Sequence, residues 1–173
     1  MVIEPMKCGT EEFEVHLPEE LIAAELEPNR VELPQRTPAE HIRWALDHPV
    51  DSAPLKELVK AGDKVCIVIS DVTRRWQSPE TYIPVLIAEL ESAGIRDEDM
   101  LIISATGTHR RQTPEEHMGL VTKEVYERIE LVDHVCTDEE NLSYVGTTSR
   151  GTPVWLDKRA LACDKIILTG GVV

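Results

Sequence analysis

Three stretches of the chain are almost continuously apolar, which is typical of strands that are covered on both faces of a parallel sheet. They span residues 64–70, 100–105 and 165–169. Shorter strand-like patterns predict further strands at residues 130–135, 142–145 and 154–156. The chain therefore carries enough strands for a sheet, and the most apolar of them belong at its centre.

Helix-start signals stand in the intervals between these strands. Residues 37–40 read Thr-Pro-Ala-Glu, a capping box with proline at the first helical position, and predict a helix over 37–48. A longer helix is expected from Ser78 to Gly94, and Thr113-Pro114-Glu115-Glu116 opens a shorter one. Alternating strands and helices predict an α/β fold, with a three-layer αβα arrangement around a mostly parallel, Rossmann-like sheet.

The two ends of the chain differ from this alternating pattern. Residues 1–36 are expected to form an irregular lead-in that contains one short strand at 12–17, where apolar and polar residues alternate. Residues 37–173 are expected to form the α/β domain. Residues 170–173 read Gly-Gly-Val-Val directly after a core strand, so we expect a C-terminal domain that is missing from this chain.

Composition narrows the class of protein. The 173 residues carry 18 basic and 32 acidic side chains, a formal charge of −14, which argues against nucleic-acid binding and against an anionic membrane surface. The four cysteines are scattered without a CxxC pair, and no signal peptide or long apolar run is present. These features predict a cytoplasmic protein with reduced thiols and no cysteine-based metal site.

Two polar loops follow central strands, at residues 71–75 and 105–111. Ligands of open α/β sheets gather at the carboxyl ends of strands, where both loops are expected to lie. The arginines of these loops, above all Arg74 and Arg110, suit a carboxylate or phosphate ligand. Asp71 either shapes its loop or binds a ligand, and the hydroxyls of Thr73 and Thr108 either contact an anion or bond their own backbone.

His109 is the strongest candidate for proton transfer, because imidazole changes its charge near neutral pH. It stands between Thr-Gly-Thr and Arg-Arg, a polar setting that favours a catalytic role over a purely structural one. The remaining histidines are weaker candidates, and His134 is best interpreted as a structural residue. A third polar loop at 147–152 either joins the pocket or, as we favour, forms a hairpin turn.

Four motifs resemble those of the nickel-pincer-nucleotide lactate racemases. Residues 71–74 read Asp-Val-Thr-Arg and resemble D-[HV]-T-R, and residues 105–110 read Ala-Thr-Gly-Thr-His-Arg and resemble A-T-G-x-H-R. Residues 146–154 are similar to G-T-[TS]-x-x-G-T-P-V, and Asp133-His134 is similar to N-H-[DE]. The motifs follow in order from about residue 65 to the C-terminus, whereas the usual dinucleotide, phosphate-loop and HExxH fingerprints do not occur.

The resemblance implies a racemase or epimerase of lactate-like 2-hydroxyacids, which are small-molecule substrates. In that family, hydride passes from the substrate Cα to a nickel-pincer nucleotide, which is nickel held by pyridinium-3,5-bisthiocarboxylic acid mononucleotide. By motif, His109 would be an acid/base residue, and Asp71, Val72, Thr73 and Arg74 would line the cofactor pocket. Arg74, Arg110 and Thr108 would bind the substrate or another anion. No residue of this chain is expected to ligate the metal.

The chain also departs from the family pattern. Arg75 and Trp76 stand where many members have proline and a small apolar residue. By the resemblance, a second catalytic histidine, a cofactor-anchoring lysine and a nickel-ligating histidine would follow Gly171, so we expect cofactor only in the full-length protein and an inactive fragment. The alternatives are a non-catalytic anion- or nucleotide-binding module and a phosphatase-like or transferase enzyme with His109 as nucleophile.

Overall fold

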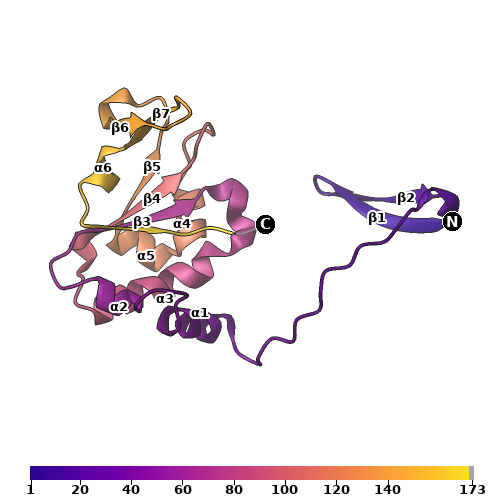
Figure 1. Cartoon of the computed structure of the whole chain (residues 1–173), viewed down its shortest axis with the longest axis horizontal. Helices are drawn as coiled ribbons and strands as arrows, with labels where there is room; N and C mark the ends of the chain where they lie inside the picture. The colour runs from indigo at the N-terminus through magenta and orange to yellow at the C-terminus, as the bar shows by residue number, and fades with distance from the viewer. Residues whose placement is uncertain (172–173) are drawn as a thin grey trace. The chain divides into compact units, whose positions relative to one another are not determined.

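The computed structural model describes residues 1–171, and the chain divides into two compact units, Met1–Gln35 and Arg36–Val173. The first unit is an antiparallel hairpin of β1 (Val2–Cys8) and β2 (Glu11–Leu17), followed by a 3-10 turn at Glu19–Leu21 (Figure 1). Strand β2 was predicted, but β1 was not, so the expected irregular lead-in is more regular than its sequence indicates. Residues 172–173 of the expected C-terminal loop lie outside the described residues.

A four-stranded sheet forms the centre of the second unit. Its order is β5-β4-β3-β8, and all neighbouring strands are parallel. The strands are β3 (Val65–Ser70), β4 (Met100–Ala105), β5 (Glu130–His134) and β8 (Lys165–Leu168). This arrangement confirms the α/β prediction, and β3 and β4 lie side by side at the centre as expected. The third apolar stretch, β8, lies at the edge of the sheet instead, where Ile166 and Leu168 are exposed.

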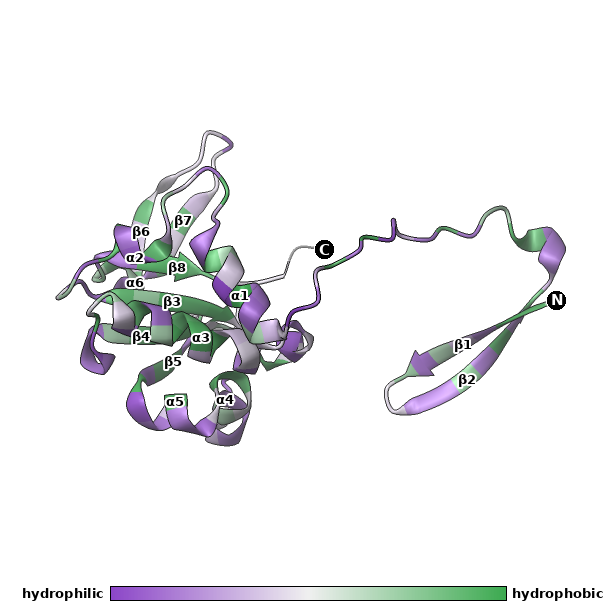
Figure 2. Cartoon of the chain, turned by 90° about the horizontal axis from the view of Figure 1, so that it is seen from below, coloured by the Kyte–Doolittle hydropathy of each residue, from purple (hydrophilic) through white to green (hydrophobic). Residues whose placement is uncertain are grey.

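Five helices cover one face of the sheet, and this side holds the main core (Figure 2). They are α1 (Pro38–Asp47), α2 (Leu55–Leu58), α3 (Pro79–Ser92), α4 (Pro114–Val121) and α5 (Lys123–Arg128). Both predicted capping boxes are present, at Thr37 with Glu40 and at Thr113 with Glu116. Fully buried side chains such as Ile67, Ile83 and Ile102 join the strands to these helices.

The other face of the sheet is covered more thinly. The short helix α6 (Lys158–Leu161) and the antiparallel hairpin of β6 (Leu142–Thr147) and β7 (Pro153–Asp157) lie on this side (Figure 1). An apolar groove of about 430 Å³ remains there, lined by side chains that include Val68, Ile103, Trp155 and Leu168. The two outer layers of the fold are therefore unequal, and the hairpin confirms the favoured interpretation of the third polar loop.

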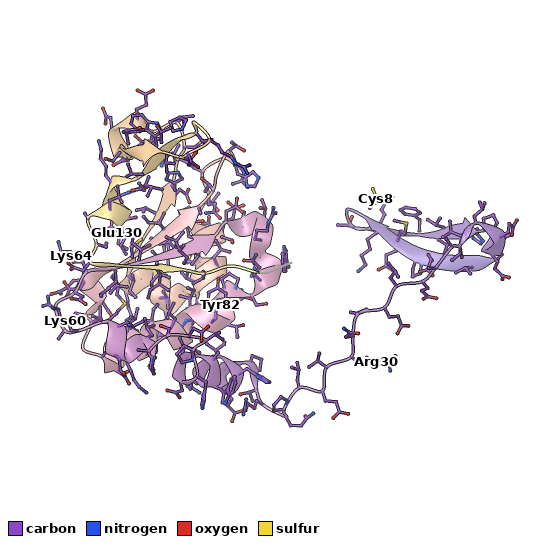
Figure 3. The ribbon with its side chains drawn as sticks, in the orientation of Figure 1. Cys8, Arg30, Lys60, Lys64, Tyr82 and Glu130 are labelled. Carbon is purple, nitrogen blue, oxygen red and sulfur yellow. The ribbon has the colours of Figure 1, made fainter. Side chains whose placement is uncertain are left out.

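The two ends of the sheet have different chemistry. Lys64 and Glu130 mark the end at which strands β3 and β5 begin (Figure 3). The loops at 71–75 and 105–111 leave the opposite end, where Ser70 of β3 pairs with Ala105 of β4. Among the described residues, no helix has both the length and the apolar character needed to cross a membrane.

Candidate functional site

The site begins where β3 ends. Asp71 caps a 3-10 helix, η2 (Val72–Gln77), and its Oδ1 accepts hydrogen bonds from Thr73 N at 3.2 Å and Thr73 Oγ1 at 2.6 Å. Such a turn is a local preference of aspartate, because its short carboxylate can reach the amide two residues ahead. The Asp71 side chain is thereby fixed at the strand end, with Oδ2 left for a second partner.

That second partner is His109, which comes from the loop after β4. His109 Nδ1 lies 2.5 Å from Asp71 Oδ2, although the two residues are 38 positions apart. The backbone amide of His109 donates to Thr106 O at 2.9 Å, and Gly107 has a φ of +59°, a value that favours glycine. The loop therefore turns tightly enough to bring the imidazole back over the end of β3.

The Asp71 side chain is 5% exposed, whereas the His109 side chain is 49% exposed. Burial by itself would raise the pKa of Asp71, but hydrogen bonds from Thr73 and His109 outweigh it, so the pKa is lowered. Asp71 is thus ionised at neutral pH. Because a carboxylate only accepts hydrogen bonds, Nδ1 of His109 carries the proton in this contact, and Nε2 of a neutral ring keeps its lone pair.

Both loops line one cleft of about 310 Å³. Its walls include Asp71, Thr73, Arg74, Thr108 and His109. Arg74 Nη1 donates to Thr73 Oγ1 at 3.3 Å, and within residues 1–171 no carboxylate forms an ion pair with this guanidinium. The cleft therefore combines an oriented imidazole with a positive charge that is available to an anion.

Two of the predicted site residues stand outside the cleft wall. Arg110 donates to both oxygens of Glu116, at 2.8 and 2.7 Å, and this pair lowers the pKa of Glu116 to about 2. Val72 is partly buried at the start of η2 and does not line the cleft. The structure thus brings Asp71, Thr73, Arg74, Thr108 and His109 together, but it joins Arg110 to the capping acid of α4.

Two of the other histidines have structural partners. His117 is buried, with Nε2 2.8 Å from Asp133 Oδ1, and His134 Nδ1 lies 3.3 Å from Asp157 Oδ2. In the part of the chain that the structure describes, no group of three or more His, Cys, Asp or Glu side chains could hold a metal ion. His109 is therefore distinguished from His117 and His134 by its position in a polar cleft and by its greater exposure.

The pairing of Asp71 with His109 was not foreseen from the sequence. The sequence placed both residues at one end of the sheet and left Asp71 either as a turn residue or as a ligand contact. A signal was present, since an aspartate and a histidine each follow a buried strand within a few residues of its end. Only the pairing of β3 with β4 converts that common position into contact.

Comparison with known proteins gives one consistent family. The lactate racemase N-terminal domain family matches residues 8–173. Over 131 residues the chain is 31% identical to a lactate racemase of Lactiplantibacillus plantarum, which covers 76% of this chain and 30% of that protein. It is 27% identical over 129 residues to a lactate racemase of Thermoanaerobacterium thermosaccharolyticum, covering 75% of this chain and 30% of that protein.

The fold agrees with these sequence matches. The structure of the lactate racemase apoprotein from Thermoanaerobacterium thermosaccharolyticum matches with a TM-score of 0.78 and 25% sequence identity. That match covers 96% of this chain and 38% of the apoprotein chain, so the present chain spans about a third of its relatives. The resemblance of the motifs is thereby confirmed, and the chain belongs to the lactate racemase N-terminal domain family.

Proposed function

We propose that this chain is the N-terminal part of a 2-hydroxyacid racemase or epimerase in which His109 moves the proton of the substrate hydroxyl. The observation that carries the proposal is the 2.5 Å contact between His109 Nδ1 and Asp71 Oδ2, beside Arg74 in one cleft. Relatives named lactate racemase support it. Because the chain spans only 30% of those relatives, the proposal concerns a longer protein with a C-terminal domain.

Asp71 prepares His109 to act as a base. The carboxylate holds the Nδ1 proton, so the lone pair of Nε2 is the proton acceptor. When Nε2 takes the hydroxyl proton, the ring becomes an imidazolium next to an ionised carboxylate, which stabilises the new charge. The same nitrogen returns the proton to the oxygen when the hydroxyacid is re-formed.

Arg74 supplies the positive charge for the substrate carboxylate. A guanidinium can donate two parallel hydrogen bonds to a carboxylate, which fixes the orientation of the acid as well as its affinity. Thr108 adds a hydroxyl donor to the same cleft. Arg110 already donates to both oxygens of Glu116, so much of its charge is neutralised before any anion binds.

The donors of the cleft fit an anionic nucleotide. Four residues would hold the nickel-pincer nucleotide, namely Asp71, Val72, Thr73 and Arg74. All of them except Val72 line the cleft. When bound, that group supplies an acceptor for the hydride on the substrate Cα. By the family resemblance, the nickel ligands would come from the nucleotide and from the part of the protein that follows Gly171.

The test uses the full-length protein, produced with nickel and the enzymes that make the cofactor. Racemisation is measured for lactate, malate and longer 2-hydroxyacids. His109→Ala is expected to reduce turnover by at least ~10²-fold, the usual contribution of a general acid/base, whereas His16→Ala on the N-terminal hairpin serves as control. An active His109→Ala enzyme would exclude the proposed role.

The main alternative is a binding module without catalysis. The cleft charge of Arg74 would suit that function as well, but an imidazole held by a buried carboxylate serves proton transfer better than binding. Anion binding by the full-length, cofactor-loaded protein without racemisation of any 2-hydroxyacid would favour the module.

A further inference from the structure

Gln112 connects the two loops of the cleft a second time. It lies between the His109 loop and α4, and its Oε1 accepts a hydrogen bond from Val72 N at 2.7 Å. Val72 N is the amide that directly follows Asp71. The Asp71 loop is therefore attached to the His109 loop at two neighbouring points, through the carboxylate of Asp71 and through the amide of Val72.

The other side of the Gln112 amide is anchored in the sheet. Nε2 donates to Ser104 Oγ at 2.7 Å and to Asp133 Oδ1 at 2.8 Å, and the backbone amide of Gln112 donates to Asp133 Oδ2 at 2.8 Å. Ser104 is fully buried and Asp133 is 7% exposed, and the two face each other across β4 and β5. Gln112 is thus attached to two buried side chains of the central sheet.

His117 completes this network from α4. Its Nε2 lies 2.8 Å from Asp133 Oδ1, so the carboxylate is bonded from the loop, from the side chain of Gln112 and from the helix. Burial alone would raise the pKa of Asp133, but the bonds from Gln112 and His117 outweigh it and lower the pKa. Asp133 therefore acts as an ionised acceptor.

Position 112 is specified by its polarity as well as by its size. An amide N–H on the Val72 side only donates, and a carboxylate on the Asp133 side only accepts. A carboxamide satisfies both at once, with its oxygen toward Val72 and its nitrogen toward Asp133. Methionine would fill the space but satisfy neither group, and glutamate would put two carboxylates within hydrogen-bond distance.

We propose that Gln112 is a positioning residue that keeps Asp71 within hydrogen-bond distance of His109. The inference rests on the proposed function of the same cleft and deepens it, since Gln112 touches neither the imidazole nor a ligand. It acts by holding the amide next to Asp71 against the end of the sheet. Without that bond, the Asp71 loop is free to move, and the proton of His109 is no longer confined to Nδ1.

The experiment measures the His109 ring rather than activity, so its failure is distinct from failure of the proposed function. NMR of the full 173-residue chain with ¹⁵N-labelled histidine gives the ratio of Nδ1-protonated to Nε2-protonated neutral ring, with His109→Gln for assignment. In Gln112→Met we expect this ratio to fall, and the Val72 amide to exchange with solvent about tenfold faster, as the loss of one hydrogen bond implies.

The double variant Gln112→Glu with Asp133→Asn separates polarity from packing. It moves the negative charge to position 112 while keeping one donor and one acceptor at the contact. Each single change is expected to disturb His109, and the pair is expected to restore at least half of the wild-type ratio. Thr113→Ala is the matched control, because it removes the neighbouring cap of α4 without touching the Gln112 bonds.

Two outcomes would overturn the inference. The first is a wild-type His109 ratio and Val72 exchange rate in Gln112→Met. The second is a double variant that is as disturbed as the single variants, which would leave no role for the polarity of the contact. If Gln112→Met does not fold, the comparison of the double variant with its two single variants still decides the question.

Discussion

Asp71→Asn isolates the carboxylate–imidazole contact, because it removes one charge from a buried side chain and hardly changes its size. Oδ1 accepts both hydrogen bonds from Thr73, whereas Oδ2 accepts only from His109. An asparagine that keeps its oxygen toward Thr73 therefore loses only the charge-assisted bond from His109 Nδ1–H and presents an NH2 donor in its place. A hydrogen bond to a charged group contributes about 1.5–3 kcal/mol. Since His109 is half exposed and water can replace its partner, we expect a loss near the lower limit, about 1.5 kcal/mol.

The direction in which this loss of stability changes with pH can also be predicted. The folded protein holds the pKa of Asp71 below its ordinary value of 3.8. Stability from this carboxylate is therefore fully present above pH 3.8 and is lost as the pH falls through the lower, folded value. The difference in unfolding free energy between wild type and Asp71→Asn should accordingly be smaller at about pH 3 than at about pH 5.

The assay is urea denaturation followed by tryptophan fluorescence at both pH values. Asp47→Asn is the control, because it removes the same charge from an exposed pair with Lys56 and should change stability by less than about 1 kcal/mol. Equal stability of wild type and Asp71→Asn at pH 5 would refute the reasoning. So would a difference that grows as the pH is lowered to 3.

Two further predictions concern the positive charge in the cleft and a cysteine in the core. Arg74→Ala in the full-length protein should weaken binding of a 2-hydroxyacid about tenfold, as expected for the loss of a charge-assisted hydrogen bond, when measured by isothermal titration. Arg111→Ala removes a charge that does not line the cleft, and an equal loss in that variant would argue against a specific role of Arg74. Burial raises the pKa of the Cys66 thiol to about 12. Iodoacetamide at about pH 8 should therefore label the exposed Cys8 and Cys136 in the native chain, and label Cys66 only after unfolding, as followed by mass spectrometry. Native labelling of Cys66 at the rate of Cys8 would contradict its burial in the core.

The elements with strong local signals could be predicted from the sequence. Strand β3 and helix α1 lie within one residue of their expected positions, because a continuous apolar run and a capping box are each written within a few residues. Strand β1 has no such signal, since Pro5 and two charged residues interrupt it, and its conformation is set by pairing with β2. The strand conformation of β1 therefore depends on its pairing with β2 and not on its own sequence.

The site shows the same division between local and long-range information. The candidate residues of the cleft could be named, but which of them pair could not, because Asp71 and His109 meet only through the sheet. The long helix expected from Ser78 begins at Pro79 instead, since Ser78 has a φ of +53°, makes no side-chain cap and ends η2 with its amide donating to Arg75 O. Arg110 was expected to bind an anion. Its actual partner, Glu116, was recognised from the sequence only as a helix-capping residue.

The pairing of Ser70 with Ala105 limits the ways in which the contact between Asp71 and His109 can be lost. A slip of β3 against β4 by one residue would move every side chain of the strand to the other face, so the register can change only in steps of two residues, about 6.6 Å. No hydrogen bond survives such a step. The central strands therefore fix where the two loops begin, and any gradual change in the distance between His109 Nδ1 and Asp71 Oδ2 must come from the loops, where Gln112 holds the amide of Val72.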